Sequence, residues 1–373
     1  MKHIRLGVIG YGFMGRTHSW GCRSLPFHYK DLPFTAELAA VASPSEASRR
    51  RAAAEGGFAL VYSDWRQLLD SPDVDAVTIS SPNGLHREML LYAIERGKHI
   101  YMDKPLVVRL EETQGIADAL RGKSLTHQMV FHNRFFASTL RARQLIDEGR
   151  LGRITAFRGR YLHAGSIDPQ RPMGFKMRGQ EGGVLLDLGS HVIDLARFLL
   201  GDIECVWGKA RTLYPTRPLA DGTMTGDVGE DHVLLTATLP GGACGTLEAS
   251  KISTGVDDEF KFEIHGTKGA LLLDLTDEDS LWFFDETMPE APLGGNRGFT
   301  RIKTTSRYGD IVQFPSVKNS TGWLRGHMHC LYSFLLAVSQ ERPATPDIFE
   351  GIAAQAVMDA ATRSFASGRE ERV

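Results

Sequence analysis

A glycine-rich turn directly after the first apolar segment constrains the fold of this chain more than any other feature. Ile4–Ile9 is a short apolar run, and the next six residues follow the pattern GxGxxG. In such a turn the first glycine permits a tight bend, the second lets the backbone approach a pyrophosphate, and the third lets a helix pack on the strand. The N-terminus of that helix offers N–H groups to an anion. The pattern predicts a dinucleotide site formed by Gly10, Tyr11, Gly12, Phe13, Met14 and Gly15.

Up to about residue 100, short runs rich in Val, Ile and Ala alternate with segments long enough for a helix. This alternation is typical of a parallel sheet whose two faces are covered by helices. Gly97 is placed to end the last of these helices. The expected strands and helices are Ile4–Ile9, Leu38–Ala42, Ala76–Ser80, His99–Met102, Ser63–Leu69 and Leu85–Arg96.

From Ile154 onward the sequence changes to longer stretches in which apolar and polar residues alternate, joined by glycine-rich turns. A period of two with such turns predicts an antiparallel or mixed sheet. We therefore expect an α/β protein with two domains. Residues 1–130 would form a Rossmann domain with a doubly wound parallel sheet, and residues 131–373 an α+β domain with a large, mostly antiparallel sheet.

The composition excludes several classes of protein. The chain has 43 Lys and Arg against 45 Asp and Glu, and this balance is not that of a general nucleic-acid or membrane-surface binder. No apolar run reaches the roughly 18 residues of a membrane-spanning helix. The cysteines are far apart, which indicates neither a zinc cluster nor a disulfide framework. We expect a cytoplasmic protein without a metal; its four cysteines are Cys22, Cys205, Cys244 and Cys330.

The end of the second expected strand bears on the choice of cofactor. An acidic residue there would hold the ribose 2′-OH of NAD, but the strand leads into Ser43 and then into Arg49-Arg50-Arg51. Small hydroxyls and arginine can accept the 2′-phosphate of NADP, because guanidinium offers a fork of donors to phosphate oxygens. Such arginines can also form a solvated helix face. Ser43 and Arg49 are therefore candidate cofactor ligands, and NAD and NADP both stay open with a slight preference for NADP.

A lysine follows the fourth expected strand, in Asp103-Lys104-Pro105. At the carboxyl edge of a parallel sheet, where ligands bind, an ammonium group can hydrogen-bond a substrate hydroxyl and stabilise negative charge developing on its oxygen. The alternative is a surface lysine before a turn. We predict that Lys104 is catalytic.

Asp187, His191 and Asp194 have the spacing i, i+4 and i+7, which predicts that they share one face of a helix. The pKa of histidine lies near neutrality, so His191 can accept a hydroxyl proton and return it in the reverse reaction. Asp187 would bind a substrate hydroxyl or orient the imidazole, and Asp194 would hold the helix or a neighbouring loop. Without a third ligand at a recognisable spacing, we expect no metal here.

Five motifs in this order resemble those of the Gfo/Idh/MocA family of NAD(P)-dependent oxidoreductases, the group of glucose–fructose oxidoreductase and inositol dehydrogenase. They cover nearly the whole chain, and Asp103 stands where the family more often has Glu. The motifs are the turn at residues 10–15, P-N-x-x-H at 82–86, Asp103-Lys104-Pro105, Asn133-Arg134-Phe135 with L-I-x-x-G-x-L-G-x-I at 145–154, and G-G-x-x-x-D-x-G-x-H-x-x-D at 182–194.

The resemblance implies roles for further residues. It places Lys104 beside the nicotinamide and the carbon that gives up hydride, and Asn133 near the same cleft. Trp323 and His327 are weaker candidates for the substrate site. Additional cofactor-binding residues would be Ser81, Pro82, Asn83, His86, Asp103, Lys104 and Arg134. Substrate-binding residues would be Lys104, Tyr161, His163, Lys176, Asp187 and His191.

The resemblance also implies the reaction, which is hydride transfer between NAD(P) and a secondary hydroxyl or keto group of a sugar, cyclitol or related polyol. Lys104 and His191, from different domains, would act at the same carbon. It further implies a homodimer or homotetramer. Two alternatives stay open: redox-neutral chemistry with a tightly bound cofactor, such as elimination, isomerisation or a glycosidase-like reaction, and a non-catalytic NAD(P) sensor. A sensor needs neither Lys104 nor His191.

Overall fold

The computed structural model describes residues 1–373 except 180, 294, 306–307, 309–312 and 317. The chain divides into two compact units. The first consists of residues 1–132 with the described part of 310–355, and the second of the described part of 133–309 with residues 356–373. The expected domain boundary at residues 130 and 131 stays a prediction.

The first unit contains a six-stranded parallel sheet with the order β3-β2-β1-β4-β5-β6. The strand order reverses beside β1, so the carboxyl ends of β1 and β4 flank the switch point where ligands of such sheets bind. The predicted doubly wound parallel sheet is confirmed. Its strands are β1 (Lys2–Ile9), β2 (Phe34–Ala42), β3 (Leu60–Tyr62), β4 (Ala76–Ile79), β5 (His99–Met102) and β6 (His127–Met129).

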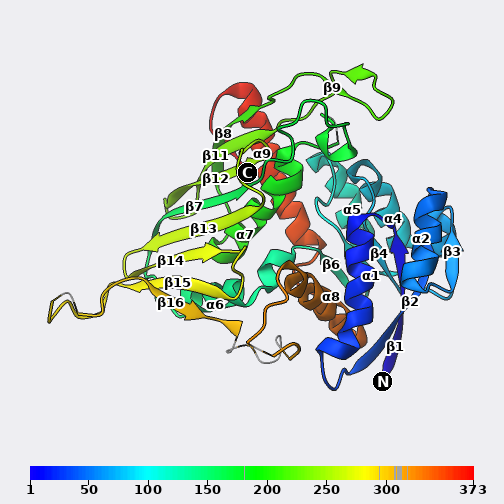
Figure 1. The fold of residues 1–373 in the computed structure, drawn as a ribbon, viewed down its shortest axis with the longest axis horizontal. Coiled ribbons are helices and arrows are strands. Elements are labelled where there is room, and N and C mark those ends of the chain that lie inside the picture. Colours follow the sequence, from blue (N-terminus) through cyan, green and yellow to red (C-terminus); the bar gives the residue numbers. More distant parts are fainter. Residues whose placement is uncertain (180, 294, 306–307, 309–312, 317) are drawn as a thin grey trace. The chain divides into compact units, whose positions relative to one another are not determined.

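Helices of the first unit form two groups against this sheet (Figure 1). Helices α2 and α8 both contact α1, and α8 also lies against β1, β2 and β5, while α3, α4 and α5 form the second group. Buried Leu6, Val8 and Ile79 show the mainly apolar strands that such a covered sheet requires. The helices are α1 (Phe13–His28), α2 (Glu46–Gly56), α3 (Trp65–Asp70), α4 (His86–Glu95), α5 (Thr113–Leu120), α8 (Trp323–Ser339) and the first part of α9 (Ile348–Ser367).

The second unit contains a nine-stranded sheet with the order β16-β15-β14-β13-β7-β12-β11-β8-β17. Among the described strands of this sheet, only β7 and β12 pair in parallel, so the predicted large, mostly antiparallel sheet is confirmed. Helix α7 (Ser190–Leu200) packs on β7 and β12, and α6 (Ala137–Asp147) packs on β14 and β15. The strands are β7 (Ile154–Leu162), β8 (Cys205–Arg211), β11 (His232–Thr238), β12 (Cys244–Ser250), β13 (Glu259–Gly266), β14 (Gly269–Asp274), β15 (Ser280–Asp285), β16 (Thr300–Lys303) and β17 (Glu371–Arg372), with a separate pair β9 (Arg217–Pro218) and β10 (Met224–Thr225).

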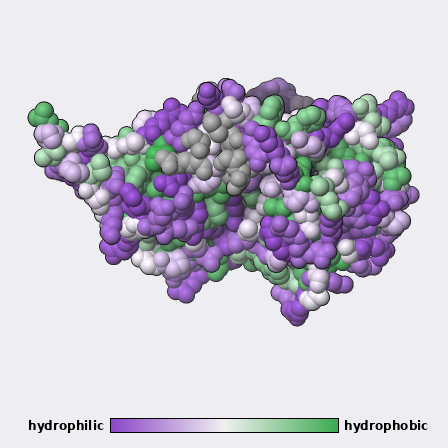
Figure 2. Space-filling model, turned by 90° about the horizontal axis from the view of Figure 1, so that it is seen from below, coloured by the Kyte–Doolittle hydropathy of each residue, from purple (hydrophilic) through white to green (hydrophobic). Residues whose placement is uncertain are grey.

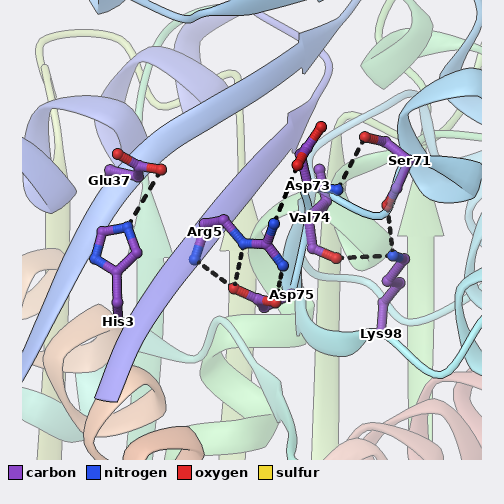
Figure 3. Close-up of polar contacts among 8 residues, drawn as sticks. All are labelled: His3, Arg5, Glu37, Ser71, Asp73, Val74, Asp75 and Lys98. Carbon is purple, nitrogen blue, oxygen red and sulfur yellow. Dashed lines mark hydrogen bonds and ion pairs between the residues drawn. The ribbon is translucent and has the colours of Figure 1, made fainter. Parts of the chain in front are cut away.

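A polar network holds the amino edge of the first sheet (Figure 3). The Arg5 guanidinium donates to both carboxylate oxygens of Asp75 at 3.0 and 2.7 Å. Nearby, Lys98 Nζ donates to the carbonyls of Ser71 and Val74 at 2.8 and 2.7 Å. These contacts tie the loop before β4 to β1 and β5. Because this edge is opposite the glycine turn, we assign the network a structural role.

The surface drawn in Figure 2 is mainly hydrophilic, with hydrophobic residues in scattered groups. Scattered apolar residues are normal on the surface of a folded protein. This face therefore agrees with the balanced composition of the chain.

His18 makes the stability of the first unit sensitive to acid. The residue is 1% exposed, its Nδ1 lies 2.7 Å from Thr78 Oγ1, and burial lowers its pKa from 6.5 to about 4. Between these pKa values the unfolded chain binds a proton at His18 that the folded chain does not. Acidification through this range should therefore reduce the free energy of unfolding by about 1.4 kcal/mol per pH unit, or about 3 kcal/mol in total.

We expect His18→Gln to reduce the slope of the free energy of unfolding against pH over the same range. The reduction should be about 1.4 kcal/mol per pH unit, which is the contribution of one proton. Urea unfolding at several pH values measures this slope. The control is His3→Gln, because His3 is an exposed histidine on β1. Equal slopes for wild type and the His18 variant would contradict the prediction.

Candidate active site

The glycine turn has the geometry that a dinucleotide requires. Gly10 has φ +85°, and a Cβ on it would lie 2.5 Å from the carbonyl oxygen of Ser80. A Cβ on Gly15 would lie 1.9 Å from the oxygen of Gly10, so both positions require glycine. At Gly12, by contrast, no described atom lies within 4 Å of a Cβ position. Gly12 is also the N-cap of α1, so a pyrophosphate could approach both its backbone and the first N–H groups of the helix.

The end of β4 is tied to this turn and to the loop after β5. Ser80 Oγ donates to the carbonyls of Ile9 and Gly10 at 3.0 and 3.1 Å. The buried His86 ring lies between the carbonyls of Pro105 and Ser81, at 2.8 Å from Nδ1 and 3.0 Å from Nε2. Burial lowers the pKa of His86. His86 thus joins two loops of the candidate cofactor site, and its direct contact with a cofactor stays a prediction.

Arg49 already has partners in the turn after β2. Its Nη1 donates to the carbonyls of Ser43 and Pro44 at 2.7 and 2.9 Å. Ser45 caps α2 by accepting a hydrogen bond from the Ser48 N–H at 3.3 Å. The guanidinium therefore stabilises the turn at which the ribose of a dinucleotide is expected.

Lys104 lies at the carboxyl end of β5, and its N–H donates to Asp103 Oδ1 at 2.8 Å. Burial lowers the pKa of His132 to about 3, and the charge of Lys104 contributes to this shift. The His132 ring stacks on His327 with centroids 3.7 Å apart, and the ring of Trp323 lies 4.1 Å from His327. A buried, neutral ring such as His132 near an ammonium group lowers the local dielectric, which strengthens the interaction of that group with an oxyanion. Trp323 and His327 were weak candidates, and His132 was missed because no spacing marked it.

In the second unit, His191 lies in the first turn of α7 and is 7% exposed. Its Nδ1 lies 3.2 Å from the side-chain amide of Asn133, and the Tyr161 ring lies 5.9 Å from its own ring. Tyr161 in turn stacks on Phe260 with centroids 4.7 Å apart. These contacts fix the orientation of the imidazole, as a proton-transferring histidine requires.

Asp187 lies in η5 (Leu185–Gly189), a π-helical turn that leads into α7. A turn of this kind is often found at functional sites. It forms the first part of the helix on which the sequence placed Asp187, His191 and Asp194. Lys176 Nζ lies 2.8 Å from Asp187 Oδ1, and Lys251 Nζ lies 3.0 Å from Oδ2. Lys251 was not a candidate in the sequence.

His163 belongs to the same group of side chains. Its Nδ1 accepts a hydrogen bond from the Gly165 N–H at 2.9 Å. Burial, and then the charge of Lys251, lower the pKa of His163 to about 4. Burial raises the pKa of Tyr161, with a smaller contribution from the charge of Asp258. The second unit therefore brings five sequence candidates together: Tyr161, His163, Lys176, Asp187 and His191.

Arg134 and Asp194 form a buried ion pair within the second unit. Arg134 Nε lies 3.1 and 3.0 Å from the two carboxylate oxygens, and the side chains are 6% and 1% exposed. The guanidinium also lies 5.0 Å from the ring of Phe198. The pair links η3 (His132–Phe135) to α7, in agreement with the holding role predicted for Asp194. A contact between Arg134 and a cofactor stays a prediction.

We expect Asp194→Ala to lower the free energy of unfolding by about 3–5 kcal/mol, because it leaves the buried Arg134 charge without this partner. Chemical denaturation measures the loss. Asp147→Ala is the matched control, since Asp147 pairs with Arg143 at the surface, and such pairs contribute less than about 1 kcal/mol. Similar losses for the two variants would contradict this account of Asp194.

Comparison with known families assigns two successive segments that make up most of the chain. Residues 4–132 match the family described as "Oxidoreductase family, NAD-binding Rossmann fold", and residues 139–272 match the "GFO/IDH/MocA C-terminal domain". The chain belongs to the Gfo/Idh/MocA family of oxidoreductases. The resemblance seen in its motifs is thereby confirmed, and the glycine turn is part of the NAD-binding domain of this family.

Relatives of this Gfo/Idh/MocA protein act on sugars and cyclitols. Levoglucosan dehydrogenase of Pseudarthrobacter phenanthrenivorans is 31% identical, over 98% of this chain and 97% of its own length. The scyllo-inositol 2-dehydrogenase (NAD(+)) of Bacillus subtilis is 30% identical over 73% of this chain and 75% of its own length. A structure of levoglucosan dehydrogenase with NADH and L-sorbose superposes with a TM-score of 0.94 at 31% identity, covering 100% of this chain and 99% of that one.

At the level of the family, these matches confirm the predicted enzyme class, an NAD-linked oxidoreductase of the sugar and inositol dehydrogenase group. Among the residues that the structure describes, no helix has the length and apolar character needed to cross a membrane.

Proposed function

We propose that this Gfo/Idh/MocA protein oxidises a secondary hydroxyl group of a monosaccharide or anhydrosugar, with NAD as the hydride acceptor. The observation that carries this proposal is the similarity to levoglucosan dehydrogenase over almost the full length of both chains. The second unit supports it, because several polar side chains surround Asp187 and His191. Convergent donors and acceptors of this kind suit a ligand with many hydroxyl groups.

The roles of the residues follow from what the oxidation requires. NAD, when bound, supplies the acceptor for the hydride that leaves the carbon. The Lys104 ammonium would stabilise the charge that develops on the hydroxyl oxygen, and His191 would take the proton from it. Asp187 would accept a hydrogen bond from another hydroxyl of the sugar and so orient the reacting carbon.

We propose NAD rather than NADP, in place of the slight preference for NADP that the arginines favoured. Arg49, the arginine that the sequence made a candidate for a 2′-phosphate, already donates to two carbonyls of its own turn. The similar proteins support this choice, because they include a levoglucosan dehydrogenase with bound NADH and a scyllo-inositol 2-dehydrogenase (NAD(+)).

The assembly and the location belong to the same proposal. The sheet of the second unit leaves the large side chains of Leu234 and Trp282 more than 40% exposed, and a second copy of the chain covering this face would bury them. A homodimer or homotetramer is therefore proposed. The cysteines are free thiols, which supports a cytoplasmic location.

A spectrophotometric assay tests the function directly. Levoglucosan, glucose, scyllo-inositol and myo-inositol are each offered with NAD and with NADP, and formation of the reduced cofactor is followed. We expect turnover of at least one pyranose, with a higher kcat/KM for NAD than for NADP. No turnover with any of these compounds, together with a cofactor that stays bound through dialysis, would favour the redox-neutral alternative.

A further inference from the structure

A buried lysine in the second unit has no place in the reaction described above. Lys251 follows β12 and is 5% exposed. Its Nζ lies 3.0 Å from Asp187 Oδ2 and donates to the carbonyl of Lys176 at 3.2 Å. A buried ammonium group is costly unless it is paired and hydrogen-bonded. The contacts with Asp187 and with the Lys176 carbonyl meet that condition.

The two oxygens of Asp187 contact cations of different kinds. The side chain of Lys251, beside Oδ2, is 7% exposed, whereas that of Lys176, beside Oδ1, is 51% exposed. An exposed ion pair contributes about 0–1 kcal/mol, and breaking a buried one costs several times more. The contact with Lys251 is therefore the persistent one, and the contact with Lys176 is the one that a ligand can replace.

The backbone hydrogen bonds also indicate that Lys251 is held in place more firmly than Lys176. The Lys251 N–H donates to the Asp231 carbonyl, and its own carbonyl accepts from the Ser166 N–H, both at 2.8 Å. Lys251 is thus held on two sides at the end of a strand in the middle of the sheet. Lys176 lies in η4 (Phe175–Met177), a single 3₁₀ turn.

We propose that Lys251 is a positioning residue that holds Asp187 ionised and oriented, while Lys176 releases Asp187 Oδ1 to a hydroxyl group of the substrate and then binds the neighbouring oxygen. The ligand class is a vicinal diol, because one hydroxyl donates to Asp187 and the adjacent oxygen accepts from Lys176. This inference rests on the proposed function and extends it to the substrate. It is consistent with a neutral His163, whose pKa is lowered to about 4 by burial and then by the charge of Lys251.

The experiment compares Lys251→Met, Lys251→Arg and Lys176→Met in the full chain, with NAD and the sugar that the wild type oxidises fastest. Lys251→Met should lower kcat about tenfold or more, because a misoriented Asp187 misplaces the reacting carbon. Lys251→Arg, which keeps the charge, should restore part of this loss. Lys176→Met should raise KM about tenfold, because a hydrogen bond from a charged group to the substrate is lost.

Lys261→Met is the control, since Lys261 is a lysine of the same sheet that pairs with Glu259 and Asp274. Its kcat and KM should equal those of the wild type. The double variant Asp187→Asn/Lys251→Met should have the kcat of Asp187→Asn alone, because Lys251 acts through Asp187. Additive losses, or a Lys251→Met variant with lower stability but unchanged kcat, would overturn the inference.

Calorimetric titration of the sugar in the presence of NADH separates this inference from the proposed function. Because NADH cannot accept a hydride, the titration measures binding of the sugar without its oxidation. The inference expects wild type to bind the diol, and Lys176→Met and Asp187→Asn to bind it at least about tenfold more weakly. Equal binding by all three proteins would overturn the inference even if the wild type oxidises sugars. If the wild type bound the sugar but formed no NADH from it with NAD, and the variants bound it more weakly, the proposed function alone would fail.

Discussion

Replacing Lys104 by methionine should lower kcat for sugar oxidation by a factor of about 10²–10³, the usual cost of losing one donor to a developing oxyanion. The lysine lies at the carboxyl end of β5, on the same edge of the sheet as the glycine turn. Its charge contributes to the lowered pKa of the buried, neutral His132, so this charge should act with little screening by water. Steady-state kinetics measures kcat, and fluorescence titration measures the affinity for NADH.

The affinity for NADH should change far less than kcat, because the glycine turn and the start of α1 are intact in this variant. Lys123→Met provides the control, as Lys123 is an exposed lysine of the same unit. If Lys104→Met kept the kcat of the wild type, the proposed oxyanion role would be wrong.

His191→Asn should lower kcat by about 10²–10⁴, the range for loss of a positioned acid or base. The imidazole is buried, and its contacts with Asn133 and Tyr161 hold it in one orientation. Because asparagine cannot take up the proton, the loss should fall mainly on kcat. His232→Asn is the control, since His232 is a half-buried histidine of the same unit that pairs with Glu248 at 3.1 Å.

Combining Lys104→Met with His191→Asn tests whether the two residues serve one step. Residues that act as a unit show losses that are far from additive. We therefore expect the double variant to have nearly the kcat of the slower single variant. Fully multiplied losses would assign the two side chains to independent steps.

The parallel sheet and the glycine turn could be predicted because their signals are local. The turn needs glycine at residues 10 and 15, where a Cβ would collide with the backbone, and this requirement is visible as a spacing in the sequence. The strands before and after it are short apolar runs with clear boundaries. Local patterns of this kind lead directly from sequence to fold.

Lys251 could not be predicted because its role depends on contacts between distant segments. It follows a strand that pairs in parallel with β7, and its partner Asp187 lies more than sixty residues earlier in the chain. A single lysine after an alternating segment has no distinctive spacing. The π-helical turn at Asp187 depends in a similar way on Glu230, whose carboxylate accepts from the Leu185 N–H at 2.9 Å.

The structure of this protein with NADH and the sugar that it oxidises fastest would test the account most directly. The account predicts that Lys104 Nζ and a ring nitrogen of His191 both lie within hydrogen-bonding distance of one sugar oxygen, whose carbon faces the nicotinamide. A bound sugar whose oxygen next to the nicotinamide contacts neither side chain, or contacts only one of them, would contradict it.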